Sequence, residues 1–96
     1  MAVRILIERI VEEGQEVKLH ELLTKLRSLA LQKGKGYISG ETLRCLDTPN
    51  KFLVISTWND LKEWKAWQAD PERAEIQKAL NNVLRAPETV TAYSNL

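Results

Sequence analysis

The order of hydrophobic periodicities constrains this 96-residue chain more than any other feature. Four runs have the apolar and β-branched composition of strands: 3–10, 37–46, 52–58 and 89–93. Apolar residues recur at helical spacing over 16–32 and again from 60 to 85. With right-handed crossovers, this strand, helix, strand, strand, helix, strand order predicts a ferredoxin-like α+β fold, in which two helices cover one face of a four-stranded antiparallel sheet.

Local signals divide the second half of the chain further. The stretch Asp47-Thr48-Pro49-Asn50 has Pro and Asn at the central turn positions and predicts a hairpin between the second and third strands. Asp60, followed three residues later by Glu63, has the form of a capping box. Asp70 precedes Pro71, which fits the first position of a helix, so we expect the second helix to break and restart at Asp70.

The apolar residues of the third strand predict that the sheet packs against a second chain. Phe52 and Val54 alternate with Leu53 and Ile55, so both faces of this strand are apolar. A single domain over residues 1–96 buries only roughly 60–65% of the surface that its unfolded chain exposes. We therefore expect a homodimer that stacks two sheet faces, as in a dimeric α+β barrel.

Composition excludes several partners. The formal net charge is +1 with both signs interspersed, which argues against nucleic acid and anionic membranes. Cys45 is the single cysteine, so an internal disulfide is excluded and a reducing compartment is favoured. Arg4, Glu8 and Arg9 interrupt the apolar N-terminal stretch, and no run approaches the ~18 apolar residues of a membrane helix. These observations favour a cytoplasmic protein.

The segment WNDLKEWKAWQADPERAEIQKAL, together with the element order and a strand that ends at Trp58, gives the chain a family likeness. It resembles the antibiotic biosynthesis monooxygenase family of small dimeric α+β barrels over nearly the whole chain. That family includes cofactor-independent oxygenases that convert phenolic polyketides into quinones, haem-degrading monooxygenases, quinol oxygenases and isomerases. The resemblance implies a homodimer and a small-molecule substrate.

Few of the site residues of this family are present at the matching positions of this chain. The Asn, Trp and His of haem-degrading members fall on Glu8, Trp67 and Ile76, so the axial imidazole is missing and haem is disfavoured. The quinone-forming members share Trp58, but their Asn, Tyr and Arg fall on Val54, Trp64 and Gln77.

The three tryptophans, Trp58, Trp64 and Trp67, lie within ten positions of one another. Trp58 ends a buried strand and is expected in the core. Trp64 and Trp67 lie on one side of a helix, where they either fill the gap between helix and sheet or wall an apolar pocket for a planar ligand. The resemblance favours the pocket.

Two residues are candidate catalytic bases. His20, the only histidine, lies at the edge of the apolar stripe of the first helix, and an imidazole of ordinary pKa suits proton abstraction from a phenol. Glu8 is the alternative, because desolvation in a pocket raises the pKa of a carboxyl. His20 and Glu8 are explained equally well as solvated surface residues.

Other polar residues are weaker candidates for substrate binding. Tyr37 and Thr42 on the second strand could donate hydrogen bonds to a substrate oxygen, and Arg73 could hold an acidic group. Cys45 has no evident base beside it and is expected to be inert. No metal-ligand spacing, phosphate loop or Ser-His-Asp arrangement is present.

The sequence therefore leaves three functions open. By resemblance, we expect a cofactor-independent monooxygenase that acts on a small aromatic or quinol-like molecule. The alternatives are a haem-binding or haem-degrading protein with altered ligands, and a non-catalytic dimer that binds a small molecule.

Overall fold

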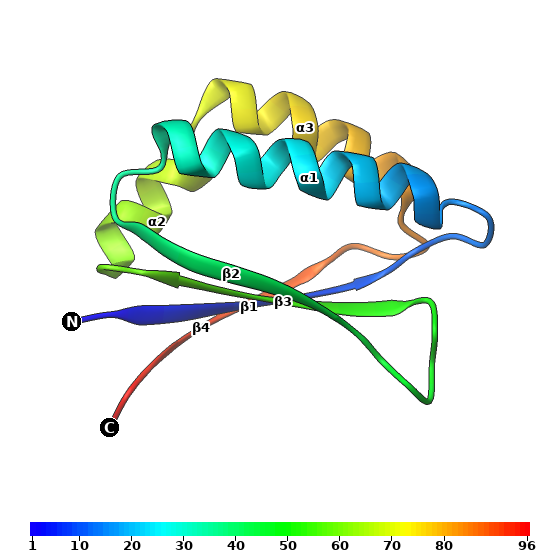
Figure 1. The fold of residues 1–96 in the computed structure, drawn as a ribbon, viewed down its shortest axis with the longest axis horizontal. Coiled ribbons are helices and arrows are strands. Elements are labelled where there is room, and N and C mark those ends of the chain that lie inside the picture. The colour runs from blue at the N-terminus through cyan, green and yellow to red at the C-terminus, as the bar shows by residue number, and fades with distance from the viewer.

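The computed structural model describes residues 1–96 and contains one antiparallel sheet and three helices. The elements in order are β1 (Val3–Ile10), α1 (Glu16–Lys33), β2 (Tyr37–Arg44), β3 (Lys51–Trp58), α2 (Leu61–Gln68), α3 (Pro71–Val83) and β4 (Thr89–Ser94). The strands pair in the order β2-β3-β1-β4, and all helices lie on one side of the sheet (Figure 1). The predicted ferredoxin-like fold is confirmed, with its second helix divided in two.

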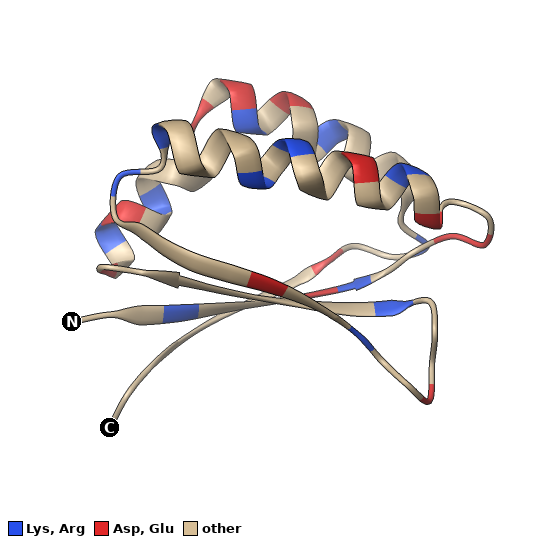
Figure 2. Ribbon diagram, viewed as in Figure 1, with Lys and Arg blue, Asp and Glu red and all other residues tan.

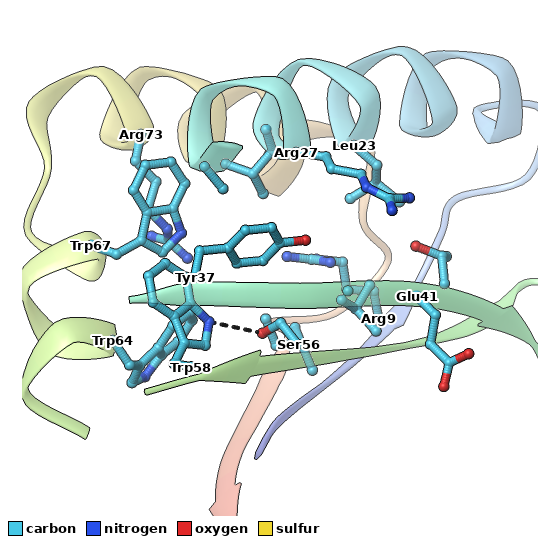
Figure 3. A pocket seen from close by; sticks show the side chains of 16 residues that line it. Arg9, Leu23, Arg27, Tyr37, Glu41, Ser56, Trp58, Trp64, Trp67 and Arg73 are labelled. Carbon is cyan, nitrogen blue, oxygen red and sulfur yellow. Dashed lines mark hydrogen bonds between the residues drawn. The ribbon is translucent and has the colours of Figure 1, made fainter. Parts of the chain in front are cut away.

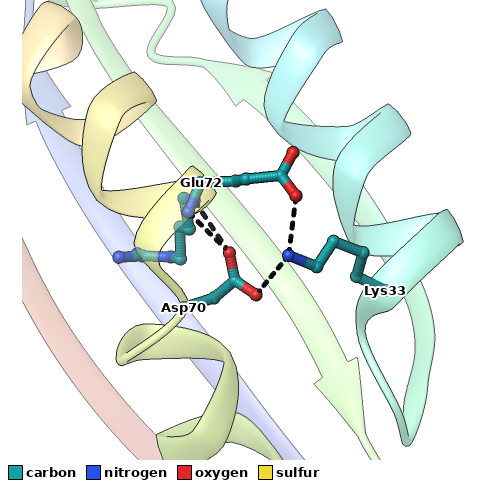
Figure 4. Close-up of polar contacts among 4 residues, drawn as sticks. Lys33, Asp70 and Glu72 are labelled. Atoms are coloured by element: carbon teal, nitrogen blue, oxygen red, sulfur yellow. Dashed lines mark hydrogen bonds and ion pairs between the residues drawn. The ribbon is translucent and has the colours of Figure 1, made fainter.

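The division of the second helix lies at Asp70, as predicted. The Asp70 carboxylate accepts hydrogen bonds from the backbone N–H groups of Glu72 at 2.9 Å and Arg73 at 3.1 Å, which caps the first turn of α3. Lys33, the last residue of α1, contacts both Asp70 at 2.9 Å and Glu72 at 2.8 Å (Figure 4). The hydrogen bond from Lys33 lowers the pKa of Asp70 below its ordinary value. This cluster fixes the start of α3 against the end of α1.

The core lies between the sheet and the helices. Its half nearer α2 contains Ile5, Ile7, Ala30, Trp58, Trp64 and Trp67. Its other half contains Val11, Leu19, Leu22, Phe52, Leu80 and Val83. Because side chains alternate along a strand, Ile5 and Ile7 of β1 point toward the helices, and so does Arg9.

The opposite side of the sheet, called here the outer face, has no helix over it (Figure 1). Leu43 of β2 is 45% exposed and Tyr93 of β4 is 54% exposed. Every residue of β4 is exposed. The outer face therefore leaves apolar side chains in contact with solvent.

Charged residues of both signs are interspersed along the helices (Figure 2). This distribution agrees with the formal net charge of +1. None of the three helices combines the length and the hydropathy that crossing a bilayer requires.

Candidate functional site

A cavity of about 90 Å³ lies between the sheet and the helices, and we call it the tryptophan cavity after Trp58, Trp64 and Trp67. Strands β1, β2 and β3 form its floor, α1 covers it, and α2 and α3 close one end (Figure 3). Pockets for drug-sized ligands are typically about 300–1,000 Å³. The tryptophan cavity therefore suits a single ring, or a larger molecule that extends through the opening.

Trp58 is the centre of an aromatic cluster in this cavity. Its ring centroid lies 5.2 Å from that of Tyr37, 5.6 Å from Trp64 and 6.1 Å from Trp67. Its Nε1–H donates to the Ser56 hydroxyl at 3.2 Å, so its polar edge is satisfied within the sheet. The three indoles are buried and also border the cavity, so they belong both to the core and to its wall.

Tyr37 and Thr42 both line the cavity from β2. The Tyr37 ring extends along the floor with its hydroxyl directed away from the tryptophans (Figure 3). A Cβ atom at position 40 would lie 2.6 Å from the Tyr37 hydroxyl, so Gly40 makes room for that oxygen. Near this point a bulge interrupts the pairing of β2 with β3.

Arg9 brings a positive charge into the apolar wall. It is 1% exposed, and its Nε donates to Oε2 of Glu88 at 2.7 Å. Its other two nitrogens, Nη1 and Nη2, are buried without a hydrogen-bond partner. Burial lowers the pKa of the Arg9 guanidinium from its ordinary value, while the charge of Glu88 and its hydrogen bond oppose that shift. The group remains protonated, because an arginine keeps its charge in proteins.

Arg73 brings a second guanidinium to the same cavity. It is 7% exposed and lies 5.7 Å from the ring centroid of Trp64 and 5.9 Å from that of Trp67. Its Nε is buried and has no hydrogen-bond partner. Burial is the main cause that lowers the pKa of Arg73; the nearby Glu88 raises it, and the charge of Arg9 lowers it further.

The two candidate bases lie outside the tryptophan cavity. Glu8 points to the outer face, the side opposite Arg9, where its carboxylate lies 3.7 Å from the Lys51 ammonium. His20 is exposed on α1 and does not line the cavity. The structure thus brings Trp58, Trp64, Trp67, Tyr37, Thr42 and Arg73 together and leaves both bases apart.

Sequence reasoning missed Arg9, Ser56, Arg27 and Glu41, all of which line the cavity. A signal for Arg9 was present, because it continues the alternation of Ile5 and Ile7 and is followed by the buried Val11. A charged residue at a buried strand position indicates a paired or ligand-binding group.

The residues at the cavity do not fit haem. Ile76 packs beside the core half that contains Leu80, and neither His20 nor Cys45 borders the cavity. The chain has no group of three or more His, Cys, Asp or Glu side chains placed to hold a metal ion. The cavity therefore offers no histidine or cysteine as an axial ligand to a haem iron.

Comparison with known proteins places the chain in a family. The family model described as antibiotic biosynthesis monooxygenase matches residues 2–79. The chain belongs to this family. The matched segment contains every residue that lines the tryptophan cavity, whereas Glu88 lies beyond it. A comparison with curated proteins gives no match.

Solved structures share the fold of this family member at low sequence identity. SnoaB, a cofactor-independent oxygenase from Streptomyces nogalater, has a TM-score of 0.88 at 16% identity, covering 99% of this chain and 93% of that chain. A conserved protein from Methanosarcina mazei Go1 has a TM-score of 0.89 at 19% identity, covering 97% and 91%. Rv0793 from Mycobacterium tuberculosis has a TM-score of 0.87 at 14% identity, covering 100% and 96%. At these identities the likeness shows a common fold.

Proposed function

We propose that this protein is a cofactor-independent monooxygenase that acts on a small aromatic or quinol-like molecule. The observation that carries the proposal is the tryptophan cavity, in a chain of the antibiotic biosynthesis monooxygenase family. Trp58, Trp64 and Trp67 supply flat apolar surfaces against which an aromatic ring can pack. Tyr37 and Thr42 can donate hydrogen bonds to oxygens on that ring.

The reaction proposed is the oxidation of a phenol to a quinone. The substrate first loses its phenolic proton, and the resulting anion transfers one electron to O₂, giving a substrate radical and superoxide. These combine to form a carbon–oxygen bond, the resulting peroxide anion takes up one proton, and loss of water from the hydroperoxide leaves a quinone. One phenol and one O₂ thus give one quinone and one water. An enclosed apolar site protects such intermediates from side reactions with solvent.

Oxygen uptake measured with a panel of phenols and quinols tests this function. We expect saturable uptake with formation of the quinone, and a marked loss of turnover in Trp67→Ala, which opens the cavity wall. Leu61→Ala, on the same helix but outside the cavity, is the matched control and should retain turnover. No uptake with any member of the panel would contradict the proposal.

The same assay tests the two bases. Because Glu8 and His20 lie outside the cavity, we expect Glu8→Gln and His20→Ala to keep most of the activity. Loss of turnover in either variant, with the fold intact, would assign that residue a catalytic role.

A second candidate function is a small-molecule binding dimer without turnover. It is favoured by the absence of a histidine from the cavity and by the position of Glu8 on the outer face. Saturable quenching of tryptophan fluorescence by a phenol, with no oxygen uptake, would support this function.

We propose further that two copies associate through the outer face. Leu43 and Tyr93 are exposed on this face, and association would remove them from water. Light scattering coupled to size exclusion should give twice the mass of one chain, and Tyr93→Lys should shift the population toward monomer. A monomer at micromolar concentration would contradict this assembly.

A further inference from the structure

The tryptophan cavity has more buried positive charge than its own residues neutralise. Arg9 and Arg73 are both buried beside it, and Glu88 is the one carboxylate in contact with Arg9. Nη1 and Nη2 of Arg9 and Nε of Arg73 have no hydrogen-bond partner. Buried polar groups in folded proteins are rarely left without a partner, so this arrangement calls for an explanation.

The other charged groups around the cavity do not supply a second carboxylate in contact with the buried guanidinium groups. Glu88 pairs with Arg9, whereas Arg73 forms no ion pair and is affected by Glu88 and by Asp70, which itself pairs with Lys33, only through their charge. Arg27 of α1 and Glu41 of β2 also line the cavity, but both are exposed, so solvent screens them. Helix α2 contributes only the indoles of Trp64 and Trp67 to the cavity, and β3 contributes no charged side chain. No carboxylate forms an ion pair with Arg73, so a bound anion would offset positive charge that is buried at the cavity.

The position of Arg9 shows where that anion would lie. Glu88 holds the Nε side of the guanidinium, and Glu88 itself is not part of the cavity wall. The guanidinium extends from β1 toward the aromatic end of the cavity (Figure 3). Its free nitrogens therefore offer hydrogen-bond donors to a ligand whose ring packs against the tryptophans.

We propose that the tryptophan cavity binds its aromatic ligand as an oxyanion, with the phenolate oxygen hydrogen-bonded to Nη1 and Nη2 of Arg9. Arg73, stacked beside Trp64 and Trp67, adds a second positive charge to the field at that oxygen. This inference rests on the proposed function insofar as the bound ligand is taken to be the substrate.

The proposal accounts for a site in which neither expected base, Glu8 or His20, borders the cavity. A protein that binds the phenolate more tightly than the phenol shifts the equilibrium of the bound ligand toward the anion. The phenolic proton is then released to solvent, and neither Glu8 nor His20 is needed to accept it. Arg9 thus supplies the electrostatic part of substrate activation.

The test follows the ionisation of 4-nitrophenol bound to the wild-type protein, because its phenolate absorbs visible light and its phenol does not. We expect the apparent pKa of the bound ligand to fall by about one pH unit or more below its value in water. Benzoate should compete for the site, and the uncharged benzyl alcohol should compete poorly. An unchanged or raised ligand pKa would overturn the proposal.

Variants then assign the effect to Arg9. In the double variant Arg9→Gln/Glu88→Gln both charges of the pair are removed, so no buried charge is left unpaired. We expect phenolate affinity to fall roughly tenfold to a hundredfold and the pKa shift to be largely lost. The matched control is Arg85→Gln/Glu12→Gln, which removes an exposed Arg–Glu pair whose atoms lie 3.6 Å apart. Equal effects of the two double variants would contradict a role of Arg9 in binding.

Failure of this proposal and failure of the proposed function can be told apart. If 4-nitrophenol binds as its phenolate but no phenol supports oxygen uptake, the anion site stands and the monooxygenase assignment fails. If phenols are oxidised but bind in their neutral form, the monooxygenase assignment stands and the anion site fails.

Discussion

Replacing Glu88 with Gln is expected to lower the free energy of unfolding by about 3–5 kcal/mol, because the substitution leaves a buried charge without its partner. Arg9 is 1% exposed and Glu88 is the one carboxylate that contacts it, at 2.7 Å. The glutamine amide can still accept a hydrogen bond from Nε, but it carries no charge to offset the guanidinium. Urea denaturation followed by circular dichroism measures the loss.

The control for this experiment is Glu12→Gln. Glu12 pairs with Arg85 at the surface, where both side chains are 53% exposed, so its replacement should change stability by at most about 1 kcal/mol. If Glu88→Gln and Glu12→Gln had equally small effects, water would have to reach Arg9 in solution, and no bound anion would be needed to satisfy it.

Replacing Trp58 with Ala is expected to destabilise the fold by about 3–5 kcal/mol, because a large core side chain leaves a cavity that its surroundings fill only in part. Trp58 is 1% exposed and packs against Tyr37, Trp64 and Trp67. Its ring also lies close to the backbone at Gly34, where an added Cβ would be 3.1 Å from the indole. Chemical denaturation measures the change.

A surface substitution provides the comparison for Trp58→Ala. Leu31 lies on α1 and is 68% exposed, so Leu31→Ala should change stability by no more than about 0.5 kcal/mol. A comparably small effect of Trp58→Ala would mean that this tryptophan serves ligand binding more than packing.

The aromatic part of the site could be predicted from the sequence. Trp64 and Trp67 are three residues apart on one helix, and Trp58 ends a strand of recognisable composition, so their convergence on one layer follows from periodicity. The charged part of the site was harder to predict from the sequence. Arg9 occupies a buried strand position, but the sequence does not show which carboxylate would neutralise it.

The order of the elements, the hairpin after β2 and the break at Asp70 could be predicted from the sequence, because periodicity, turn residues and helix caps act over a few neighbouring positions. The charges that meet at the cavity could not be predicted in this way, because they come from distant parts of the chain. Arg9 and Glu88 are 79 residues apart, and their contact depends on the pairing of β4 with β1. The alternation along β1 turns Arg9 inward and Glu8 outward, so the cavity receives a buried cation and not the carboxylate that was expected there.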